Sequence, residues 1–383
     1  MENILWILFF ILFPALIIYL CEKLPLLDKL GPVVLCYLIG IILGNLSILP
    51  DNFASTQDLF TTITVPLALP LMFFSMDLRG FKKTAGKALI SLFIAGAVII
   101  VSTGVSFFIF KDLVGPESWK MAGMLIGCYT GGTPNLAAIG TALEIENTAY
   151  LAVHASDVVV CAFYLLFLLS FAPSLLKKVL PAYVPRSTET DSVDVKKYGD
   201  TFMDFKRGDF WPLLKAFGLA VLIMAVGGGL SFIVKPEISM TVAILTITTL
   251  SVIASFIPSI RKIRMTFQLG HYVILIFSLV VSSMANVQEL VATAPAVIGY
   301  VTSVIVISAV LHTLLSLVFK IDRDTHIITT TAMVYSPPFV PLVAASLKNK
   351  EIVITGVLIG VAGWVAGNYL GISVAYLLRN LAF

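Results

Sequence analysis

The chain alternates between long apolar runs and short polar clusters. A transmembrane helix needs about 20 mostly apolar residues. Runs of this kind predict membrane-spanning helices over residues 3–21, 31–48, 59–77, 87–110, 149–172, 211–234, 239–258, 271–286, 291–319 and 352–380. No basic residue precedes the first run, and that run is long enough to span, so we expect an uncleaved first helix and not a signal peptide.

Two further apolar segments, 118–143 and 325–347, are interrupted by residues that break helices. The break in the first segment consists of Tyr129, Thr130, Gly131, Gly132, Thr133, Pro134 and Asn135. The break in the second consists of Tyr335, Ser336, Pro337 and Pro338. Glycine and proline at this density interrupt helical hydrogen bonding. Because unpaired backbone cannot face lipid, we predict that protein or a watery cavity encloses both breaks.

A polar stretch, residues 181–209, divides the chain into two membrane halves, 1–180 and 210–383, and we interpret it as a cytoplasmic linker. The halves share short similarities at a nearly constant offset. They pair Leu49-Pro50 with Ile257-Pro258, Val98–Ser102 with Val304–Ser308, and the sequence around Tyr129 with that around Tyr335. Because a break also occurs at the same place in each half, the pattern predicts an internal repeat.

The distribution of lysine and arginine indicates how the broken segments enter the membrane. If both return as re-entrant hairpins to the side they came from, 21 of the 25 basic residues lie in the cytoplasm. If both cross, at most 16 do. Cytoplasmic loops carry the excess of positive charge, so hairpins are favoured. The predicted fold is all-α and polytopic, with about ten full transmembrane helices, two re-entrant segments, two inverted-topology repeats and the N-terminus outside.

Composition and motifs narrow the function classes. The chain is 58% hydrophobic and 12% charged, half the charged fraction of roughly 25% in soluble domains. It has no P-loop, no G-x-S-x-G and no H-E-x-x-H, so we expect neither an enzyme nor an ATP-driven pump. Nothing basic and aromatic predicts a nucleic-acid partner. The expected partners are the lipid bilayer and a small solute, with no cofactor other than a sodium coupling ion.

The two breaks are the first candidate site. At a break, free backbone carbonyls can ligate a cation and a helix N-terminus can hold a carboxylate. In the first break, Thr130, Thr133 and Asn135 add side-chain oxygens that suit Na⁺. Tyr129, Tyr335 and Ser336 offer hydrogen bonds to a solute. The alternative interpretation is that glycine and proline only bend these helices for packing.

Asp157 is the second candidate, because it lies inside an apolar helix with His154 one turn before it. A carboxylate within the membrane is costly and is therefore a functional candidate. We predict that Asp157 ligates Na⁺ together with the three oxygen-bearing residues of the first break, or carries a coupling proton. His154 is a further coupling candidate. The alternative is an aspartate that is hydrogen-bonded to a neighbouring helix.

Other polar residues have structural interpretations. His271 and His312 lie at or near helix ends, where structural hydrogen bonds are expected. Asp77 lies beside Arg79, which is typical of an interfacial ion pair. All four cysteines lie in apolar runs without a C-x-x-C pair, so we expect buried free thiols.

Three segments carry a resemblance to a known family: Met121–Ile139, His154–Asp157 and Tyr335–Pro338. They resemble the bacterial integral-membrane family called domain of unknown function 819, over nearly the whole chain, which implies the bacterial cytoplasmic membrane. The Thr-Gly-Gly-Thr-Pro-Asn run is the most specific piece.

The layout is more distantly similar to sodium/glutamate symporters and 2-hydroxycarboxylate transporters. That resemblance implies a homodimer, two hairpins that approach each other and a transport domain that slides past a scaffold. The chain departs from those families at Pro337-Pro338, where they favour glycine. Bile-acid-type carriers are another distant candidate, but their broken helices cross fully, which the charge count disfavours.

These observations predict an elevator-like secondary active transporter. It would be a Na⁺- or H⁺-coupled symporter of a small anionic organic solute, such as an amino acid, peptide or carboxylate. The solute would bind between residues 130–135 and 336–341. Two alternatives stay open. One is a cation/proton antiporter in which Asp157 is the exchanged site, and the other is a non-transporting membrane scaffold or receptor, which would tolerate Asn135→Ala.

Overall fold

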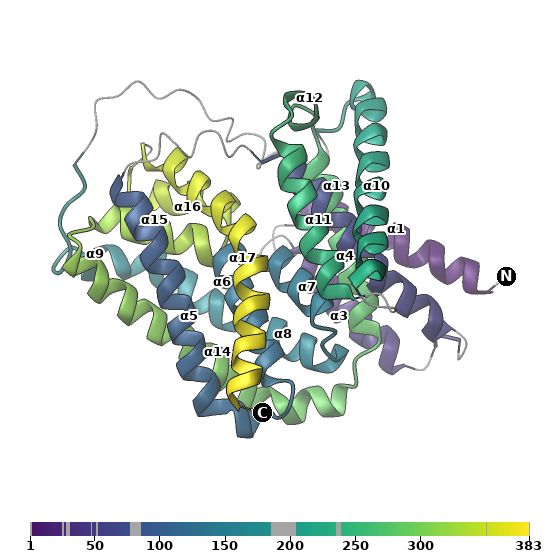
Figure 1. Ribbon diagram of the computed structural model, residues 1–383, viewed down its shortest axis with the longest axis horizontal. Coiled ribbons are helices and arrows are strands. Elements are labelled where there is room, and N and C mark those ends of the chain that lie inside the picture. The colour runs from purple at the N-terminus through teal and green to yellow at the C-terminus, as the bar shows by residue number, and fades with distance from the viewer. Residues whose placement is uncertain are drawn as a thin grey trace. The chain divides into compact units, whose positions relative to one another are not determined.

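A computed structural model describes residues 2–24, 27, 31–46, 48–50, 53–76, 86–184, 204–234, 239–349 and 351–382. Within these ranges the regular structure is helical and contains no strand (Figure 1). Asp77 and Arg79, and most of the predicted linker 181–209, lie outside the described residues.

Apolar helices coincide with every predicted span. Eight in the described part of the chain are long and apolar enough to cross a membrane: α1 (Glu2–Lys23), α4 (Ala54–Phe74), α5 (Gly86–Val114), α8 (Asn147–Ser170), α10 (Phe210–Val234), α13 (Thr266–Ser283), α14 (Val287–Val318) and α17 (Ile352–Ala382). Two apolar helices are shorter: α3 (Pro32–Asn45) and α11 (Met240–Ser255). This pattern is that of a polytopic membrane protein, while the number of full crossings stays a prediction.

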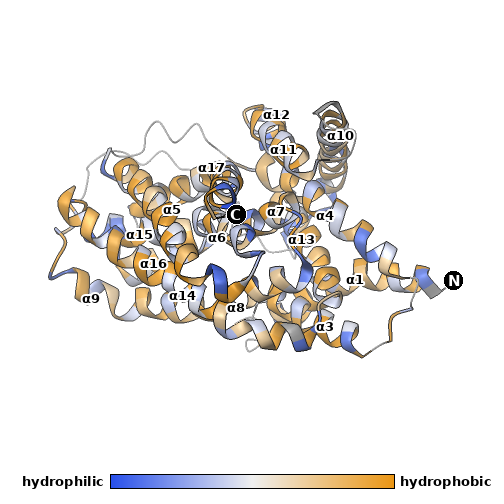
Figure 2. Ribbon diagram, turned by 60° about the horizontal axis from the view of Figure 1, so that its bottom comes forward, coloured by the Kyte–Doolittle hydropathy of each residue, from blue (hydrophilic) through white to orange (hydrophobic). Residues whose placement is uncertain are grey.

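The outward faces of these helices are apolar. Figure 2 shows hydrophobic residues along most helical turns. Large side chains such as Phe93, Leu113 and Phe163 are 72%, 71% and 72% exposed. Contact between such a surface and water is unfavourable, whereas contact with lipid hydrocarbon is not. The exposed apolar side chains therefore fit a lipid environment.

The chain forms two compact units, and each takes segments from both halves of the sequence. Unit 1 comprises Met1–Ser75, Gly140–Ala152 and Asp200–Ala294. Unit 2 comprises Met76–Ile139, Val153–Gly199 and Pro295–Phe383. The sequence-based halves 1–180 and 210–383 follow chain order, so the compact units cut across them. The repeat itself stays a prediction.

Unit 1 is built around α13, which packs against α3 and α4. Glycines bring α3 close to α13, since a Cβ at Gly40 would meet Ser282 and one at Gly44 would meet the Ser283 carbonyl. Polar groups also join these elements. The buried Gln57 Nε2 donates to Ser283 Oγ at 2.8 Å, and the exposed Asn45 Nδ2 donates at 3.1 Å to the Ala285 carbonyl, just after α13. Close packing and satisfied polar groups make this a well-specified core.

Unit 2 contains the second broken segment and all of the first up to Ile139, and each segment folds back on itself. The first is α6 (Ser118–Gly131) followed by α7 (Thr133–Ala142), and the second is α15 (Arg323–Val334) followed by a 3₁₀ turn (Pro337–Phe339) and α16 (Val340–Ser346). The Gly127 position lies against the Ile139 side chain, and Gly356 lies against both Ile328 and Val340.

The residues that meet in each segment are twelve positions apart, which a continuous helix would separate by about 18 Å. Both segments are therefore helical hairpins. We name them hairpin 1 (residues 118–142) and hairpin 2 (residues 323–346). Their position relative to the bilayer, and hence their re-entrant character, stays a prediction.

The base of hairpin 2 is closed by a buried carboxylate. Asp324 is 3% exposed. Its Oδ1 accepts from Arg323 Nε at 2.7 Å, and its Oδ2 accepts from Asn349 Nδ2 at 2.9 Å. Asn349 follows α16, so this carboxylate joins the two ends of the hairpin. Asp322 caps α15 by accepting from the Thr325 amide at 2.9 Å.

Candidate functional site

The tips of the two hairpins meet within unit 2. Ser336 Oγ donates a hydrogen bond to the Gly131 carbonyl at 3.2 Å, and the Ser336 side chain packs against Gly132. The backbone takes nearly the same conformation at both tips, with φ 78° and ψ −169° at Gly132 and φ 74° and ψ 165° at Ser336. Only glycine adopts this region readily, so Ser336 is strained. The sequence singled out both breaks, and the structure brings them together.

The strain at Ser336 leads to a test of tip geometry. We expect Ser336→Ala to be less stable than Ser336→Gly by about 1–3 kcal/mol, because only glycine relieves the strained backbone. Both variants lose the hydrogen bond to Gly131, so that loss cancels in the comparison. Thermal melting of the purified variants in detergent measures the difference. Equal melting temperatures would show that the tip does not hold this conformation.

Helix α17 supports both hairpins through a line of glycines at helical spacing. Small residues let helix backbones approach closely in membranes. A Cβ at Gly363 would meet the Thr130 carbonyl, and one at Gly360 would meet Pro337. Further contacts of this kind place Gly356 against Val340, Gly367 against Asn135, and Gly371 against Ile139. Both hairpins therefore rest on the backbone of α17.

Asn135 and Thr130 come together where hairpin 1 crosses α17. Both side chains lie against the Gly367 position. Asn135 is 1% exposed, and its Nδ2 donates to the Trp364 carbonyl at 3.0 Å. Its Oδ1 has no hydrogen-bond partner. Thr130 Oγ1 donates to the Ile126 carbonyl at 2.8 Å, which leaves its lone pairs accessible. A buried acceptor without a donor is unfavourable, and a cation would satisfy it.

Asp157 lies beside the tip of hairpin 1 and accepts hydrogen bonds from two thiols. Cys161 Sγ donates to Oδ1 at 3.1 Å, and Cys128 Sγ donates to Oδ2 at 3.6 Å. The carboxyl is 7% exposed, and the Tyr129 side chain lies near it. All four cysteines are free and buried, as expected. Cys128 and Cys161, however, are polar partners of a carboxyl and do more than fill apolar space.

Tyr335 links hairpin 2 to the helix that carries Asp157. Its hydroxyl donates to the Cys161 carbonyl at 2.7 Å. Its ring stacks on Tyr164, with centroids 6.3 Å apart. Asp157, Cys161 and Tyr164 all belong to α8, so hairpin 2 contacts this helix at its tip.

Not every candidate residue joins this cluster. Pro338 is exposed, while Thr133 and Pro134 are half-buried. His154 is buried on α8 one turn before Asp157. No group of three histidine, cysteine or acidic side chains could hold a metal ion among the residues that the structure describes. The glycines of α17 and the Trp364 carbonyl were missed from the sequence, although glycine at a spacing of three and four residues was a readable signal.

Comparison with known proteins supplies the family. The family model described as "Protein of unknown function (DUF819)" matches residues 9–381. The chain belongs to the DUF819 family. This DUF819 chain is also similar to the uncharacterized membrane protein YjcL of Bacillus subtilis (strain 168), with 24% identity over 343 residues that cover 87% of this chain and 86% of the relative. The resemblance inferred from sequence is confirmed, as is an integral membrane location.

Proposed function

We propose that this DUF819 protein is a secondary active transporter of a small anionic organic solute, coupled to Na⁺ or H⁺. One observation carries the proposal: two helical hairpins meet at strained, glycine- and proline-rich tips beside the buried Asp157. Broken helices that meet inside an apolar bundle are how transporters build a polar site at membrane depth. A scaffold has no need of such a site, because buried unpaired polar groups lower stability.

The division into units supports alternating access. Unit 1 takes α1, α3 and α4 from the first half of the chain, and α10, α11 and α13 from the second. Unit 2 takes α5, hairpin 1 and most of α8, then most of α14, hairpin 2 and α17. Each unit draws the corresponding three elements from each half, as an inverted repeat requires. In this proposal unit 2 is the transport unit and unit 1 the scaffold of an elevator-like homodimer.

The coupling ion is assigned to hairpin 1. The Asn135 Oδ1 is an unpaired buried acceptor, and Thr130 adds a hydroxyl beside it. In the proposed cycle, Na⁺ takes these oxygens together with carbonyls freed at the break. Asp157 contributes charge from α8, either as a ligand that is reached when the tips rearrange or as a proton carrier. Thr133, which is half-buried, completes the set at the mouth of the site.

The solute is assigned to the junction of the tips. The N-terminus of α7 is at the tip of hairpin 1, where backbone amides and the helix dipole favour a carboxylate. Ser336 and Tyr335 from hairpin 2 supply hydroxyl groups. An amino acid, peptide or carboxylate fits this chemistry.

Ligand-dependent melting tests the proposal. Purified protein is melted in NaCl and in choline chloride at equal ionic strength and at two pH values, and small carboxylates and amino acids are then added. A ligand at 100 times its Kd stabilises a protein by about 2.7 kcal/mol, which such a melt resolves. We expect a Na⁺-specific rise or a pH-dependent rise, followed by a further rise with one class of anion. That anion should then accumulate in proteoliposomes under the matching ion gradient.

The two alternatives predict different outcomes. A cation/proton antiporter would show ΔpH-driven Na⁺ flux that Asp157→Asn abolishes, and no response to any organic solute. A scaffold or receptor would show no flux at all and would tolerate Asn135→Ala. Either pattern would overturn the symporter proposal.

A further inference from the structure

A second buried polar cluster lies in unit 2, away from the hairpin tips. His312 on α14 and His326 on α15 lie side by side, with ring centroids 4.2 Å apart and ring planes tilted by 35°. Both residues are 4% exposed. Ionisable groups at membrane depth are costly, so a pair of imidazoles within an apolar helical protein is a candidate for function.

Every ring nitrogen of the pair faces a hydroxyl group. His312 Nδ1 lies 3.1 Å from Thr330 Oγ1, and its Nε2 lies 3.4 Å from Ser91 Oγ. His326 Nδ1 lies 2.9 Å from Ser316 Oγ, and its Nε2 lies 3.4 Å from Thr313 Oγ1. A structural histidine usually has a carbonyl or carboxylate partner that fixes one tautomer. A hydroxyl can donate or accept, so hydroxyl partners are compatible with both the neutral and the protonated ring.

The hydrogen bonds around His326 show how the pair can gain a proton. The Thr313 hydroxyl already donates to the Ala309 carbonyl at 2.8 Å, so it can only accept from His326 Nε2. In neutral His326, Nδ1 then accepts from the Ser316 hydroxyl. When Nδ1 gains a proton, it donates to the same oxygen after the Ser316 hydroxyl turns. No heavy atom has to move between the two protonation states.

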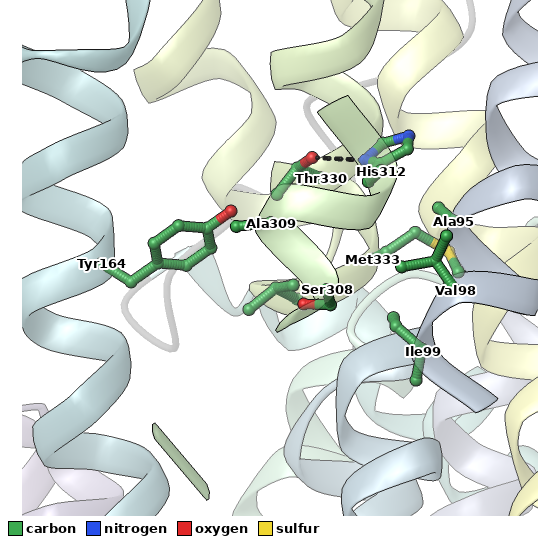
Figure 3. A pocket seen from close by; sticks show the side chains of 10 residues that line it. Ala95, Val98, Ile99, Tyr164, Ser308, Ala309, His312, Thr330 and Met333 are labelled. Atoms are coloured by element: carbon green, nitrogen blue, oxygen red, sulfur yellow. Dashed lines mark hydrogen bonds between the residues drawn. The ribbon is translucent and has the colours of Figure 1, made fainter. Parts of the chain in front are cut away.

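A small pocket borders the pair at His312. His312 and Thr330 line it together with Tyr164 and Ser308, and an apolar wall is formed by Val98 and its neighbours. Figure 3 shows Tyr164 facing the pocket from one side and Ala95, Val98 and Ile99 lining the opposite side. The pocket therefore borders the pair at His312, with the hydroxyl groups of Tyr164, Ser308 and Thr330 in an otherwise apolar lining.

We propose that the adjacent His312–His326 pair binds a single proton, which reaches it through this pocket. A second proton is excluded because two imidazolium rings this close repel each other, so the pair titrates as one unit. The proton-binding site stands on its own contacts. Its part in a transport cycle rests on the proposed function. In that cycle the bound proton adds a charge to hairpin 2, whose first helix, α15, carries His326 and ends next to Tyr335 at the tip.

Other titratable groups on the surrounding elements set the charge that the pair experiences. The N-cap of α15 is Asp322, and its first two residues are Arg323 and Asp324. Arg323 and Asp324 form an ion pair, so their charges cancel. The Tyr164 phenol from α8 lines the pocket.

On α5, the exposed Lys87 lies one turn before Ser91. On α6 and at the tip, Cys128, Tyr129 and Tyr335 surround Asp157 and Cys161 of α8. Asp322 is therefore the nearest uncancelled charge along α15 among the described residues.

Histidine-selective NMR tests the proposal, because the chain has only 4 histidines. Protein with ¹⁵N-labelled histidine is placed in lipid nanodiscs, and imidazole signals are followed from about pH 8 down to about pH 3, because burial disfavours the charged ring. We expect His312 and His326 to gain one proton between them. The double variant His312→Gln/His326→Gln should lose this step, whereas the control His271→Gln, on α13 of unit 1, should keep it. Uptake of no proton, or of two, would overturn the proposal.

A variant that retains both imidazoles covers the case in which the double variant does not fold. Ser316→Ala removes the hydroxyl that must accept from protonated His326, so the pair should bind its proton about tenfold more weakly. Unchanged proton binding in Ser316→Ala would also overturn the proposal. Na⁺-dependent melting, measured on the same samples, separates the two claims. If the pair titrates but neither ions nor solutes alter the melt, the transport proposal fails and the proton site stands.

Discussion

Replacing Asn135 with alanine is expected to leave a folded protein that no longer distinguishes NaCl from choline chloride. Asn135 Oδ1 is the buried acceptor assigned to the cation, and alanine removes it. The stabilisation that saturating Na⁺ provides, about 2.7 kcal/mol at 100 times Kd, should therefore disappear. Melting curves in the two salts, recorded at one pH and one ionic strength, measure the effect. Accumulation of solute in proteoliposomes should fall with it.

A second asparagine controls for the loss of an amide-to-backbone hydrogen bond. The exposed Asn45 on α3 also donates its Nδ2 to a distant backbone carbonyl, that of Ala285, at 3.1 Å. Asn45→Ala should lower the melting temperature in both salts equally and keep the difference between them. If Asn135→Ala behaves in the same way, the cation is not bound at hairpin 1, and Asp157 becomes the remaining candidate for coupling.

The largest loss of stability is expected for Gly363→Val. A Cβ at Gly363 would collide with the Thr130 carbonyl, which is backbone and cannot rotate away. Overpacking usually costs about 1–3 kcal/mol, and a collision between two helix backbones should reach or exceed the upper end. Thermal melting and size-exclusion chromatography of the purified variant measure the effect. We expect a strongly lowered melting temperature or an aggregated product.

A second glycine in the same unit provides the control. Gly96 on α5 has open space where its Cβ would lie, so Gly96→Val adds the same atoms without a collision. Its melting temperature should stay close to that of the unmodified protein. If Gly363→Val were equally well tolerated, α17 would not hold hairpin 1 as closely as described.

The fold class could be predicted from the sequence because the lipid bilayer constrains each segment of the chain separately. An apolar run of sufficient length has to form a helix, and each predicted run coincides with one. The breaks at Gly131-Gly132 and Pro337-Pro338 were equally readable, because glycine and proline act locally. Contacts between segments far apart in sequence were not readable. Nothing local to Ser336 indicates that its hydroxyl meets Gly131.

The candidate site was predicted in part for the same reason. Asn135 and Asp157 stood out as polar residues in apolar surroundings. The sequence predicts only structural hydrogen bonds for His312. Its partner His326 lies fourteen positions away, and the packing of α14 against α15 brings the two rings together. The sequence predicts that Cys128 and Cys161 act as small apolar residues. Their thiols act as hydrogen-bond donors because the Asp157 carboxyl lies next to them in the fold. In each case the missing information was a tertiary neighbour.

The composition of the units has a consequence for how such a protein could arise. Each compact unit needs three elements from the first half of the chain and three from the second, so neither half can complete a core by itself. If the two halves are the inverted repeat that the sequence predicts, a half-length ancestor would have had to assemble with a second copy of itself, inserted in the opposite orientation. Gene duplication and fusion would then have fixed that pairing. The polar segment between the halves would be the joint left by the fusion.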